Sequence, residues 1–297
     1  MNENALLKSF ETLFHQSADV QTGPGDDCAV ISRGNTTLLA AADQLIGQIH
    51  YYLDTPPRLA AAKLLKRNLS DIAAMGGVPR WALCTLACKD CSAKWMQEFF
   101  AGLEECAKQF NVSIIGGDLA ELPAAGQVST LTILGEAPSD EICLRSNAVP
   151  GEIVCVTGVL GDSLKSEHHL HFTPRLAEGR FLAQNHFTRC MMDLSDGLAA
   201  DLPRLLEKSA CGAIIDLDTL PRRNGCSLEN ALADGEDYEL LFTVKESVLE
   251  QLQKQWQFAE AFTPIGRITS ERGSLKYCSN GQEKDFKGVK GYEHFTV

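Results

Sequence analysis

The segment PPRLAAAKLLKRNLSDIAAMGGVPRWALCTLAC, residues 56–88, joins a helical pattern directly to a strand pattern. Apolar side chains recur at helical spacing from Leu59 to Ala73, after two prolines that favour a helix start and before a glycine pair that favours its end. Residues 79–88 form an apolar run of the length and composition typical of a strand. This segment therefore predicts a mixed α and β fold.

The same alternation continues on both sides of this segment. A second amphipathic helix is expected from Ser92 to Phe110, and Asn280-Gly281 is typical of a two-residue hairpin turn. Further strands are expected at residues 36–43, 112–118, 129–137, 152–161, 213–218 and 238–244. The segment RSNAVPGE, residues 145–152, interrupts the pattern with proline and glycine, so we expect two domains, residues 1–145 and 146–297.

The composition disfavours several classes of protein. A formal net charge of −12 argues against binding to nucleic acid, since polyanions are bound by surplus lysine and arginine. No apolar run approaches the roughly 18 residues of a membrane helix, and the first residues lack the pattern of a secretory signal. The eleven cysteines lie in apolar contexts that fit buried thiols, and Cys88 and Cys91 have no second pair at zinc-ligand spacing. We expect a cytoplasmic protein that does not associate with membranes.

Acidic residues close several of the apolar runs. They are Asp26, Asp27, Asp43, Asp71, Asp118, Asp193 and Asp196. Carboxylates at strand ends, beside glycines or a helix start, suit a hard cation that carries phosphates. Such a group without cations would raise its own pKa values and oppose folding, and the lack of clustered Cys or His favours Mg²⁺ over zinc. The set predicts an enzyme that acts on nucleotide phosphates.

Three of the acidic motifs also have a simpler interpretation. Asp26 and Asp27 lie on a turn that we expect to be exposed, where both carboxylates could be solvated. Asp71 lies on the apolar side of its helix and could pair with Lys66 or Arg67. Ser195 or Asp196 could be the N-cap of a helix that begins near Gly197. The residues alone leave these alternatives open.

Eight motifs occur along essentially the whole chain. In order they are GPGDDCAVI, AADQLIGQIHY, KRNLSDIAAMGGVPRWAL, IIGGDLAE, RSNAVPGEIVCVTG, MMDLSDGLAADL, DGEDYELLFTV and GVKGYEHF. Together they closely resemble the thiamine-monophosphate kinases. The resemblance implies an α+β, two-domain aminoimidazole-ribonucleotide synthetase-like fold, with an N-terminal α/β domain whose sheet pairs in a homodimer and a C-terminal α/β domain. It also implies ATP-dependent phosphorylation of thiamine monophosphate to thiamine diphosphate, by direct in-line transfer of the γ-phosphoryl group.

The resemblance further implies roles for individual residues. Mg²⁺ would be bound by Asp27, Asp43, Asp71, Asp118, Asp193 and Asp196. ATP would contact Gly117, Asp118, Arg145 and Ser195, and the thiamine phosphate would contact His50, Glu236 and Tyr292. The catalytic groups among these would be Asp71, Asp118, Arg145 and Asp196. Phe100 falls where the family places an aromatic ATP contact, although a core position is the simpler interpretation. His50 as a surface histidine, Glu236 as a local cap and Tyr292 as a tail anchor are the corresponding alternatives.

Three departures from the family pattern bear on activity. Ala41 and Ala42 stand where the family commonly has Ser and Thr, so hydroxyl ligands to a metal are missing. Asp234 adds a negative charge in front of Gly235 and Glu236. A helical insert of the family is shortened to KSEHHLHF, residues 165–172. Ala41, Ala42 and the shortened segment motivate one rival hypothesis, a diverged relative that binds nucleotide or thiamine phosphates without turnover. A second rival hypothesis is another ATP-using enzyme of the same fold.

Overall fold

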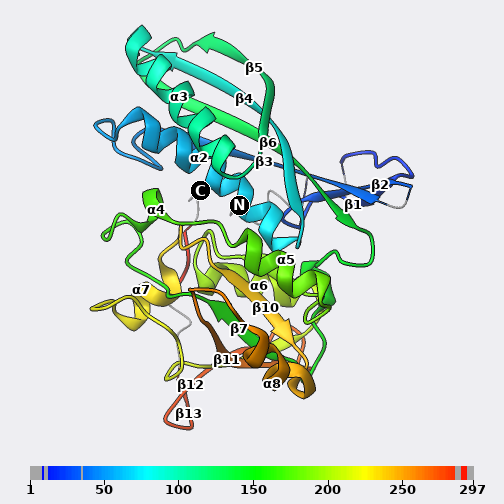
Figure 1. The fold of residues 1–297 in the computed structure, drawn as a ribbon. Helices are drawn as coiled ribbons and strands as arrows, with labels where there is room; N and C mark the ends of the chain where they lie inside the picture. Colours follow the sequence, from blue (N-terminus) through cyan, green and yellow to red (C-terminus); the bar gives the residue numbers. More distant parts are fainter. Residues whose placement is uncertain (1–8, 10–12, 35, 285–288, 293–297) are drawn as a thin grey trace.

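Two β-sheets, one from each half of the chain, form the frame of the protein (Figure 1). The computed structural model describes residues 9, 13–34, 36–284 and 289–292. The first sheet has the strand order β1-β2-β3-β6-β4-β5, and the second has the order β13-β12-β9-β11-β7-β10-β8. The strands of the first sheet are β1 (Val20–Thr22), β2 (Ala29–Arg33), β3 (Thr36–Ile46), β4 (Val78–Lys89), β5 (Ser113–Glu121) and β6 (Gly126–Pro138). Those of the second are β7 (Ile153–Thr157), β8 (Met191–Asp193), β9 (Gly212–Asp216), β10 (Leu240–Val244), β11 (Phe262–Thr269), β12 (Leu275–Ser279) and β13 (Gln282–Lys284).

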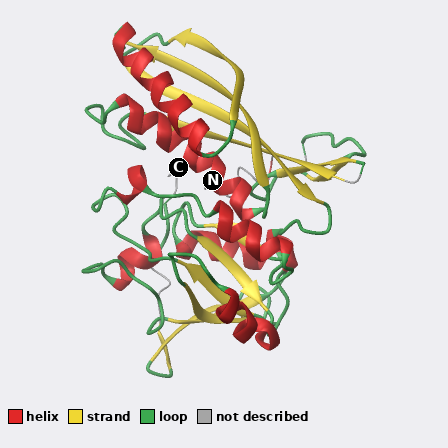
Figure 2. Cartoon of the chain, viewed as in Figure 1, coloured by secondary structure: helices red, strands yellow, loops and turns green. Residues whose placement is uncertain are grey.

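Two long helices, α2 (Pro57–Ala74) and α3 (Ala93–Gln109), pack on the first sheet (Figure 2). Both were predicted from their apolar spacing and are confirmed. The hydroxyl of Ser92 accepts a hydrogen bond from the Trp95 amide at 3.1 Å, which caps α3. Helix α2 also contacts β8, α4 and α5 of the second half, so it lies at the junction of the two sheets.

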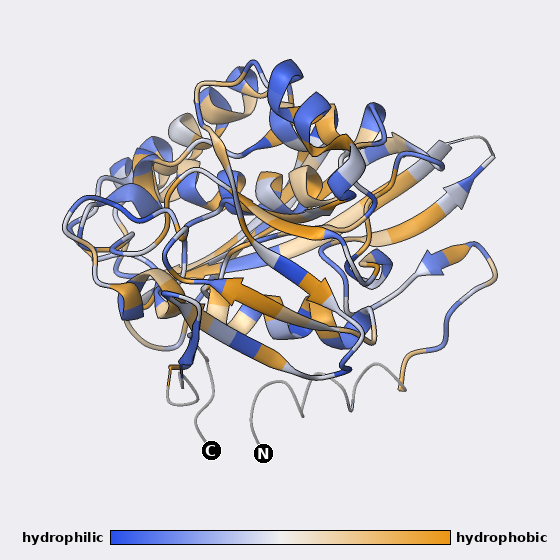
Figure 3. Cartoon of the chain, turned by 90° about the horizontal axis from the view of Figure 1, so that it is seen from below, coloured by the Kyte–Doolittle hydropathy of each residue, from blue (hydrophilic) through white to orange (hydrophobic). Residues whose placement is uncertain are grey.

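The second sheet is covered on both faces. Its helices are η1 (Arg145–Asn147), α4 (His168–His171), α5 (Leu176–Gln184), α6 (Leu198–Lys208), α7 (Leu228–Ala233) and α8 (Glu246–Gln255). Along β7, Val154 and Val156 join a core with α6, whereas Ile153 and Cys155 join a core with α5 and α8. This explains why β7 and β10 are apolar at nearly every position, a pattern of strands buried from both sides. Figure 3 shows apolar segments along several strands, whereas polar segments lie on the outer helices as well as on the loops.

Strands β4 and β5 run parallel, joined by α3, while β4, β6 and β3 are antiparallel. Gly117 on β5 lies opposite Cys84 on β4, and a Cβ atom at Gly117 would lie 1.7 Å from the Cys84 carbonyl oxygen. Only glycine permits this approach of the two backbones. The second glycine of IIGGD, Gly117, therefore has a structural reason.

All seven predicted strands are present, and the hairpin is confirmed: Ser279 pairs with Gln282 across Asn280 and Gly281, whose φ angles are 51° and 71°. The short strands β1, β2, β8, β12 and β13 and the longer β11 were not predicted. Segment 145–152 does lie between the two sheets, but the domain boundary at residues 145 and 146 stays a prediction. All eleven cysteines are free, and eight of them are buried. Among the described residues, no helix combines the length and apolar character that a membrane span requires.

Candidate functional site

Three carboxylates from distant parts of the chain converge beside α2. Asp27 precedes β2, Asp71 lies on α2 and Asp193 ends β8, and each offers an oxygen atom within 4.8 Å of the other two. Asp27 and Asp193 are buried. Close carboxylate oxygens of this kind are the ligands that hard divalent cations prefer, so the residues present fit Mg²⁺.

Hydrogen bonds hold two of the three carboxylates. Ser70, one residue before Asp71, donates from its hydroxyl to Asp193 at 2.6 Å. The guanidinium of Arg145 donates to both oxygens of Asp27, at 3.1 and 2.5 Å, and the Arg145 amide donates to Asp26 at 3.2 Å. The prediction of an exposed turn at Asp26 and Asp27 is wrong, because their side chains are only 5% and 0% exposed. The turn is buried because Arg145 pairs with its carboxylates.

Asp71 does not pair with the cations that the sequence offered as partners. Arg67 donates instead to Asp43 at 3.3 Å, and the Lys66 ammonium lies 5.6 Å from the ring centre of Phe172. In the described part of the chain, no hydrogen bond or salt bridge reaches the Asp71 carboxylate. It faces other carboxylates, which is an unfavourable arrangement in the absence of a cation.

Burial raises the pKa of Asp71 well above its usual value of 3.8, and the charges of Asp43, Asp193 and Asp27 raise it further. Burial and the charge of Asp27 likewise raise the pKa of Asp193. For Asp26, burial and the charge of Asp27 raise the pKa to about 7, although Arg145 opposes the shift. These three carboxyl groups therefore keep their protons in the folded protein over a pH range in which the unfolded chain would release them.

These shifts predict how the stability of the metal-free protein depends on pH. A carboxyl group with a raised folded-state pKa stabilises the fold at low pH, and that stability is lost as the pH rises through the folded-state pKa. We expect the melting temperature in EDTA to fall between about pH 5 and pH 8, by the equivalent of a few kcal/mol, since each pKa unit is worth about 1.4 kcal/mol. Differential scanning calorimetry across this range checks the prediction. Mg²⁺ should restore more stability at pH 8 than at pH 5, and a flat profile in EDTA would contradict the proposed charge repulsion.

Asp196 and Ser195 lie on the loop before α6. Neither caps this helix, because its N-cap is Gly197, with φ at 94°, and has no side-chain hydrogen bond. The buried carboxylate of Asp201 instead accepts hydrogen bonds from the Ser195 and Asp196 amides, at 3.0 and 2.9 Å. Arg204 donates to Asp196 at 2.6 Å. Asp201, which lies within α6, thus holds the loop by its backbone amides. The side chains of Ser195 and Asp196 line a pocket.

This pocket, about 790 Å³ in volume, brings together all three residues predicted to contact the thiamine phosphate. His50 reaches it from the loop after β3, Glu236 from the loop after α7 and Tyr292 from the C-terminal segment. The remaining lining includes Ile49, Tyr52, Arg67, Asp162, Leu164, Lys165, Ser195, Asp196, Asn230, Asp234, Tyr238 and Lys290. Segments separated by more than two hundred residues therefore share one cavity.

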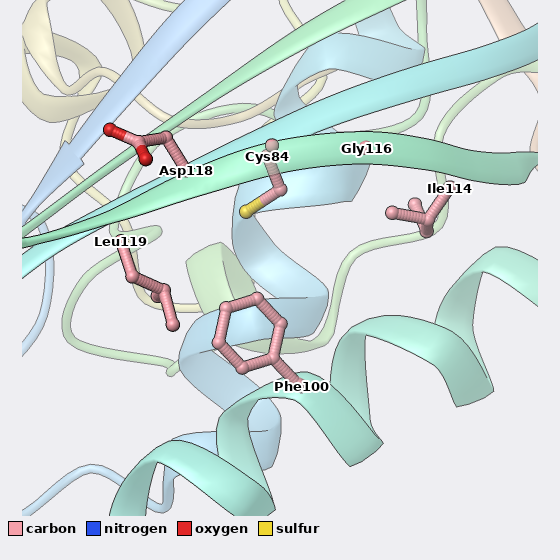
Figure 4. A pocket seen from close by; sticks show the side chains of 7 residues that line it. Cys84, Phe100, Ile114, Gly116, Asp118 and Leu119 are labelled. Carbon is pink, nitrogen blue, oxygen red and sulfur yellow. The ribbon is translucent and has the colours of Figure 1, made fainter.

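Gly117 and Asp118 line a different pocket, of about 410 Å³, together with Cys84, Phe100 and Leu119. Figure 4 shows Phe100 rising from α3 toward the sheet, while the exposed Asp118 carboxylate points away from the phenyl ring. Within the described single chain, Asp118 is not among the three converging carboxylates. Its predicted role as a metal ligand stays a prediction. Phe100 both packs on the core and lines this pocket, so its two interpretations are compatible.

All three departures from the family sequence pattern lie within the described part of the structure. Ala41 and Ala42 lie on β3 and pair with Ile133 and Thr132 of β6, so their methyl groups supply no ligand before Asp43. The Asp234 carboxylate accepts a hydrogen bond from the Asp162 amide at 2.8 Å, at the pocket rim. The shortened segment forms α4, and the ring of Phe172 after it stacks on Tyr238 with centres 4.1 Å apart.

Several residues at the site were missed by the sequence analysis. They are Lys63, Ser70, His169, Asp201 and Arg204. Lys63 is completely buried although it is charged. A signal was available, since Lys63 and Asp201 each lie among apolar residues on an amphipathic helix, where an ionised group needs a partner.

Comparison with known proteins agrees with this arrangement. The family model for the AIR synthase related protein, N-terminal domain, matches residues 25–137, and that for its C-terminal domain matches residues 157–278. The thiamine-monophosphate kinase of Salmonella typhimurium is 33% identical over 322 residues, covering 98% of this chain and 97% of the relative. The chain belongs to the thiamine-monophosphate kinase family.

Two further relatives extend over the same length. The family member from Bacillus subtilis is 31% identical, covering 99% of this chain and the whole of the relative. Among solved structures, AaThiL complexed with AMPPCP and TMP has a TM-score of 0.83 and 27% identity, covering 99% of this chain and 97% of that one. The predicted two-domain fold of the thiamine-monophosphate kinase family is therefore confirmed.

Proposed function

We propose that this protein transfers the γ-phosphoryl group of ATP to thiamine monophosphate and forms thiamine diphosphate. The observation that carries the proposal is the joint arrangement of three converging carboxylates and an adjoining pocket lined by His50, Glu236 and Tyr292. Full-length similarity to thiamine-monophosphate kinases supports it. So does the structural match to AaThiL, which is complexed with AMPPCP and TMP.

The reaction needs no catalytic base. The attacking atom is an oxygen of a phosphate monoester whose second pKa is near 6, so it is mostly ionised at pH 7. It forms a bond to the γ-phosphorus as the bond to the bridging oxygen of ADP breaks, with the two oxygens roughly in line. The difficulty is the approach of one anion to another. An acid-rich site without a Ser-His pair is consistent with catalysis by positioning and charge neutralisation.

We assign the role of holding Mg²⁺ to Asp27, Asp71 and Asp193, with Asp43 and Asp196 beside them and Asp118 as a further ligand. When bound, the cation supplies positive charge for the phosphate oxygens. Arg145 neutralises Asp27 in the absence of ligands. We further assign contacts with the nucleotide to Arg145 and Ser195, as the family resemblance implies. Gly117, Asp118 and Phe100 are proposed to contact ATP from the smaller pocket. The lack of hydroxyls at Ala41 and Ala42 reduces the number of oxygen ligands around Asp43.

The protein is further proposed to be a cytoplasmic homodimer, with domains of residues 1–145 and 146–297. Strands β4 and β5 expose Trp81, Leu83 and Ile115, which alternate with residues that face the core or the smaller pocket. An exposed apolar sheet face of this kind favours contact with a second protein surface. A second copy of the chain would bury it symmetrically.

The dimer proposal predicts that Leu83→Glu gives a monomer. A charge at this position would be desolvated in the interface without a partner, which is costly. Sedimentation velocity measures the change. Ile214→Glu is the matched control, because Ile214 on β9 is 40% exposed and Leu83 is 39% exposed. A dimeric Leu83→Glu protein, or loss of the dimer in both variants, would contradict the assignment of this face.

The activity is tested by incubating the protein with ATP, Mg²⁺ and thiamine monophosphate and measuring the products by mass. We expect thiamine diphosphate and ADP in equal amounts, and no ADP when thiamine monophosphate is left out. Binding of both ligands without product would favour the diverged relative. ADP release that depends on a different acceptor would favour another ATP-using enzyme of this fold.

A further inference from the structure

Lys63 is a completely buried lysine that the proposed chemistry does not use. Its ammonium nitrogen lies 2.5 Å from the carbonyl oxygen of His50, 2.8 Å from Nδ1 of His169 and 2.8 Å from Oε1 of Glu236. An ammonium group has three donors, and here three acceptors from three separate segments surround it. Burial of a lysine in this way is costly unless its charge is paired and hydrogen-bonded.

The three segments belong to both halves of the protein. His50 follows β3 of the first sheet, while His169 on α4 and Glu236 after α7 belong to the second half. Burial and the charge of Lys63 lower the pKa of His169 to about 4, so its ring is neutral at pH 7 and Nδ1 accepts the hydrogen bond from Lys63. Lys63 thus connects two sides of the large pocket through one charged group.

Glu236 has a conformation that needs this support. Its φ angle is 64°, in the left-handed region that is unfavourable for residues other than glycine. The backbone is held by the Ser163 hydroxyl, which donates to its carbonyl oxygen at 2.6 Å, and by its own amide, which donates to Ser195 at 2.7 Å. Lys63 is the charged group that fixes the carboxylate. Without it, the Glu236 carboxylate would keep the long hydrogen bond from the Tyr238 hydroxyl, at 3.4 Å, but would lose its ion pair.

We propose that Lys63 is a positioning residue for the phosphoryl acceptor, which it serves by fixing the Glu236 carboxylate and the His50 loop across the large pocket. The inference rests on the proposed function. Lys63 does not line either pocket, so it acts through Glu236 and His50 and does not contact the substrates. Among the described residues its side-chain partners are the His50 carbonyl, His169 and Glu236, and they do not include Asp27, Asp71 or Asp193. Its loss should therefore weaken binding of thiamine monophosphate and leave nucleotide binding nearly unchanged.

The test replaces Lys63 with methionine, which keeps the length of the side chain and removes its charge. We expect the KM for thiamine monophosphate to rise at least tenfold and the KM for ATP to change less than twofold. Isothermal titration with thiamine monophosphate alone and with ADP alone measures the same split without turnover. A purely structural role would weaken both ligands together, so equal changes in the two would overturn the proposal, as would unchanged affinity for thiamine monophosphate.

Arg180→Met is the matched control. Arg180 on α5 forms an ion pair with Glu141 and donates to the Gly76 carbonyl at 3.1 Å, so it also joins the two halves, but it lines neither pocket. We expect a loss of stability with both KM values within twofold of the wild type. A tenfold rise in the KM for thiamine monophosphate in this variant would show that any weakening of the contact between the two halves raises this KM. It would then contradict a specific role for Lys63.

A second variant covers the case in which Lys63→Met does not fold. The double variant Lys63→Met/Glu236→Gln removes both charges and avoids the buried unpaired carboxylate. It should fold and bind thiamine monophosphate more weakly than Glu236→Gln alone, because the His50 loop also loses its support. Equal affinity of these two variants would overturn the role of Lys63. If neither variant folds, Lys63 is a folding residue and the positioning role is rejected. Failure of the wild-type protein to form thiamine diphosphate would reject the proposed function instead, and direct titration of the wild type and Lys63→Met would still decide the role of Lys63.

Discussion

Replacing Asp71 with asparagine is expected to lower the rate of thiamine diphosphate formation by more than about a hundredfold. Even residues that only support metal ligands typically cost about 10- to 100-fold when removed, and Asp71 is assigned to the ligand set itself. The same change should raise the melting temperature of the metal-free protein, because it removes a half-buried carboxylate that faces Asp27 and Asp193 without a hydrogen bond or salt bridge in the described part of the chain. Steady-state kinetics and a thermal scan in EDTA measure the two effects.

The combination of lower activity and higher metal-free stability is what separates a metal ligand from a structural carboxylate. A structural Asp71 would give a less stable protein, since its partners would be left unsatisfied. Asp140→Asn is the control, because Asp140 is an exposed carboxylate on the turn after β6 and its replacement should change neither property. Near-normal turnover by the Asp71→Asn enzyme would end the metal assignment.

Replacing Gly117 with alanine is expected to destabilise the first half of the protein by about 3 kcal/mol or more. The new Cβ atom would lie 1.7 Å from the Cys84 carbonyl oxygen, so β5 must move away from β4. Asp118 and the lining of the smaller pocket would move with it. Calorimetry should record a lower first transition, and the KM for ATP should rise if this pocket receives the nucleotide.

Gly126→Ala provides the comparison for this substitution. Gly126 begins β6 in the same sheet, but a Cβ atom there would meet no neighbour closer than 3.4 Å, at Leu122. Because alanine is favoured over glycine within a strand, we expect a stability within about 1 kcal/mol of the wild type. A Gly117→Ala protein as stable as Gly126→Ala would show that the β4 and β5 backbones tolerate a wider separation than the structure indicates.

The local features of this protein were predicted from short stretches of sequence. Residues 57–74 and 93–109 are helices because their apolar residues recur at helical spacing. Asn280 and Gly281 form a hairpin turn because both accept positive φ angles. The metal-binding and substrate-binding residues were assigned by resemblance to a family, and the structure brings many of them together without testing their roles.

The burial of charged groups was not predicted. The sequence suggested an exposed turn at Asp26 and Asp27, yet both carboxylates lie against Arg145, more than a hundred residues away in the chain. Lys63 was overlooked, although it touches three segments that surround the large pocket. Partners of this kind cannot be identified from the spacing of neighbouring residues.

The sequence by itself determined the type and place of most helices and strands, because these depend on the spacing of apolar residues and on the backbone angles that glycine, proline and asparagine allow. The partners of the charged side chains were decided only by the tertiary structure. Strand β6 pairs between β3 and β4, and β10 pairs between β7 and β8, so segments distant in the chain become neighbours. The packing of α2 against β8 and α4 of the second half then brings Ser70 to Asp193 and Lys63 to Glu236, and burial makes an unpaired charge costly at these positions.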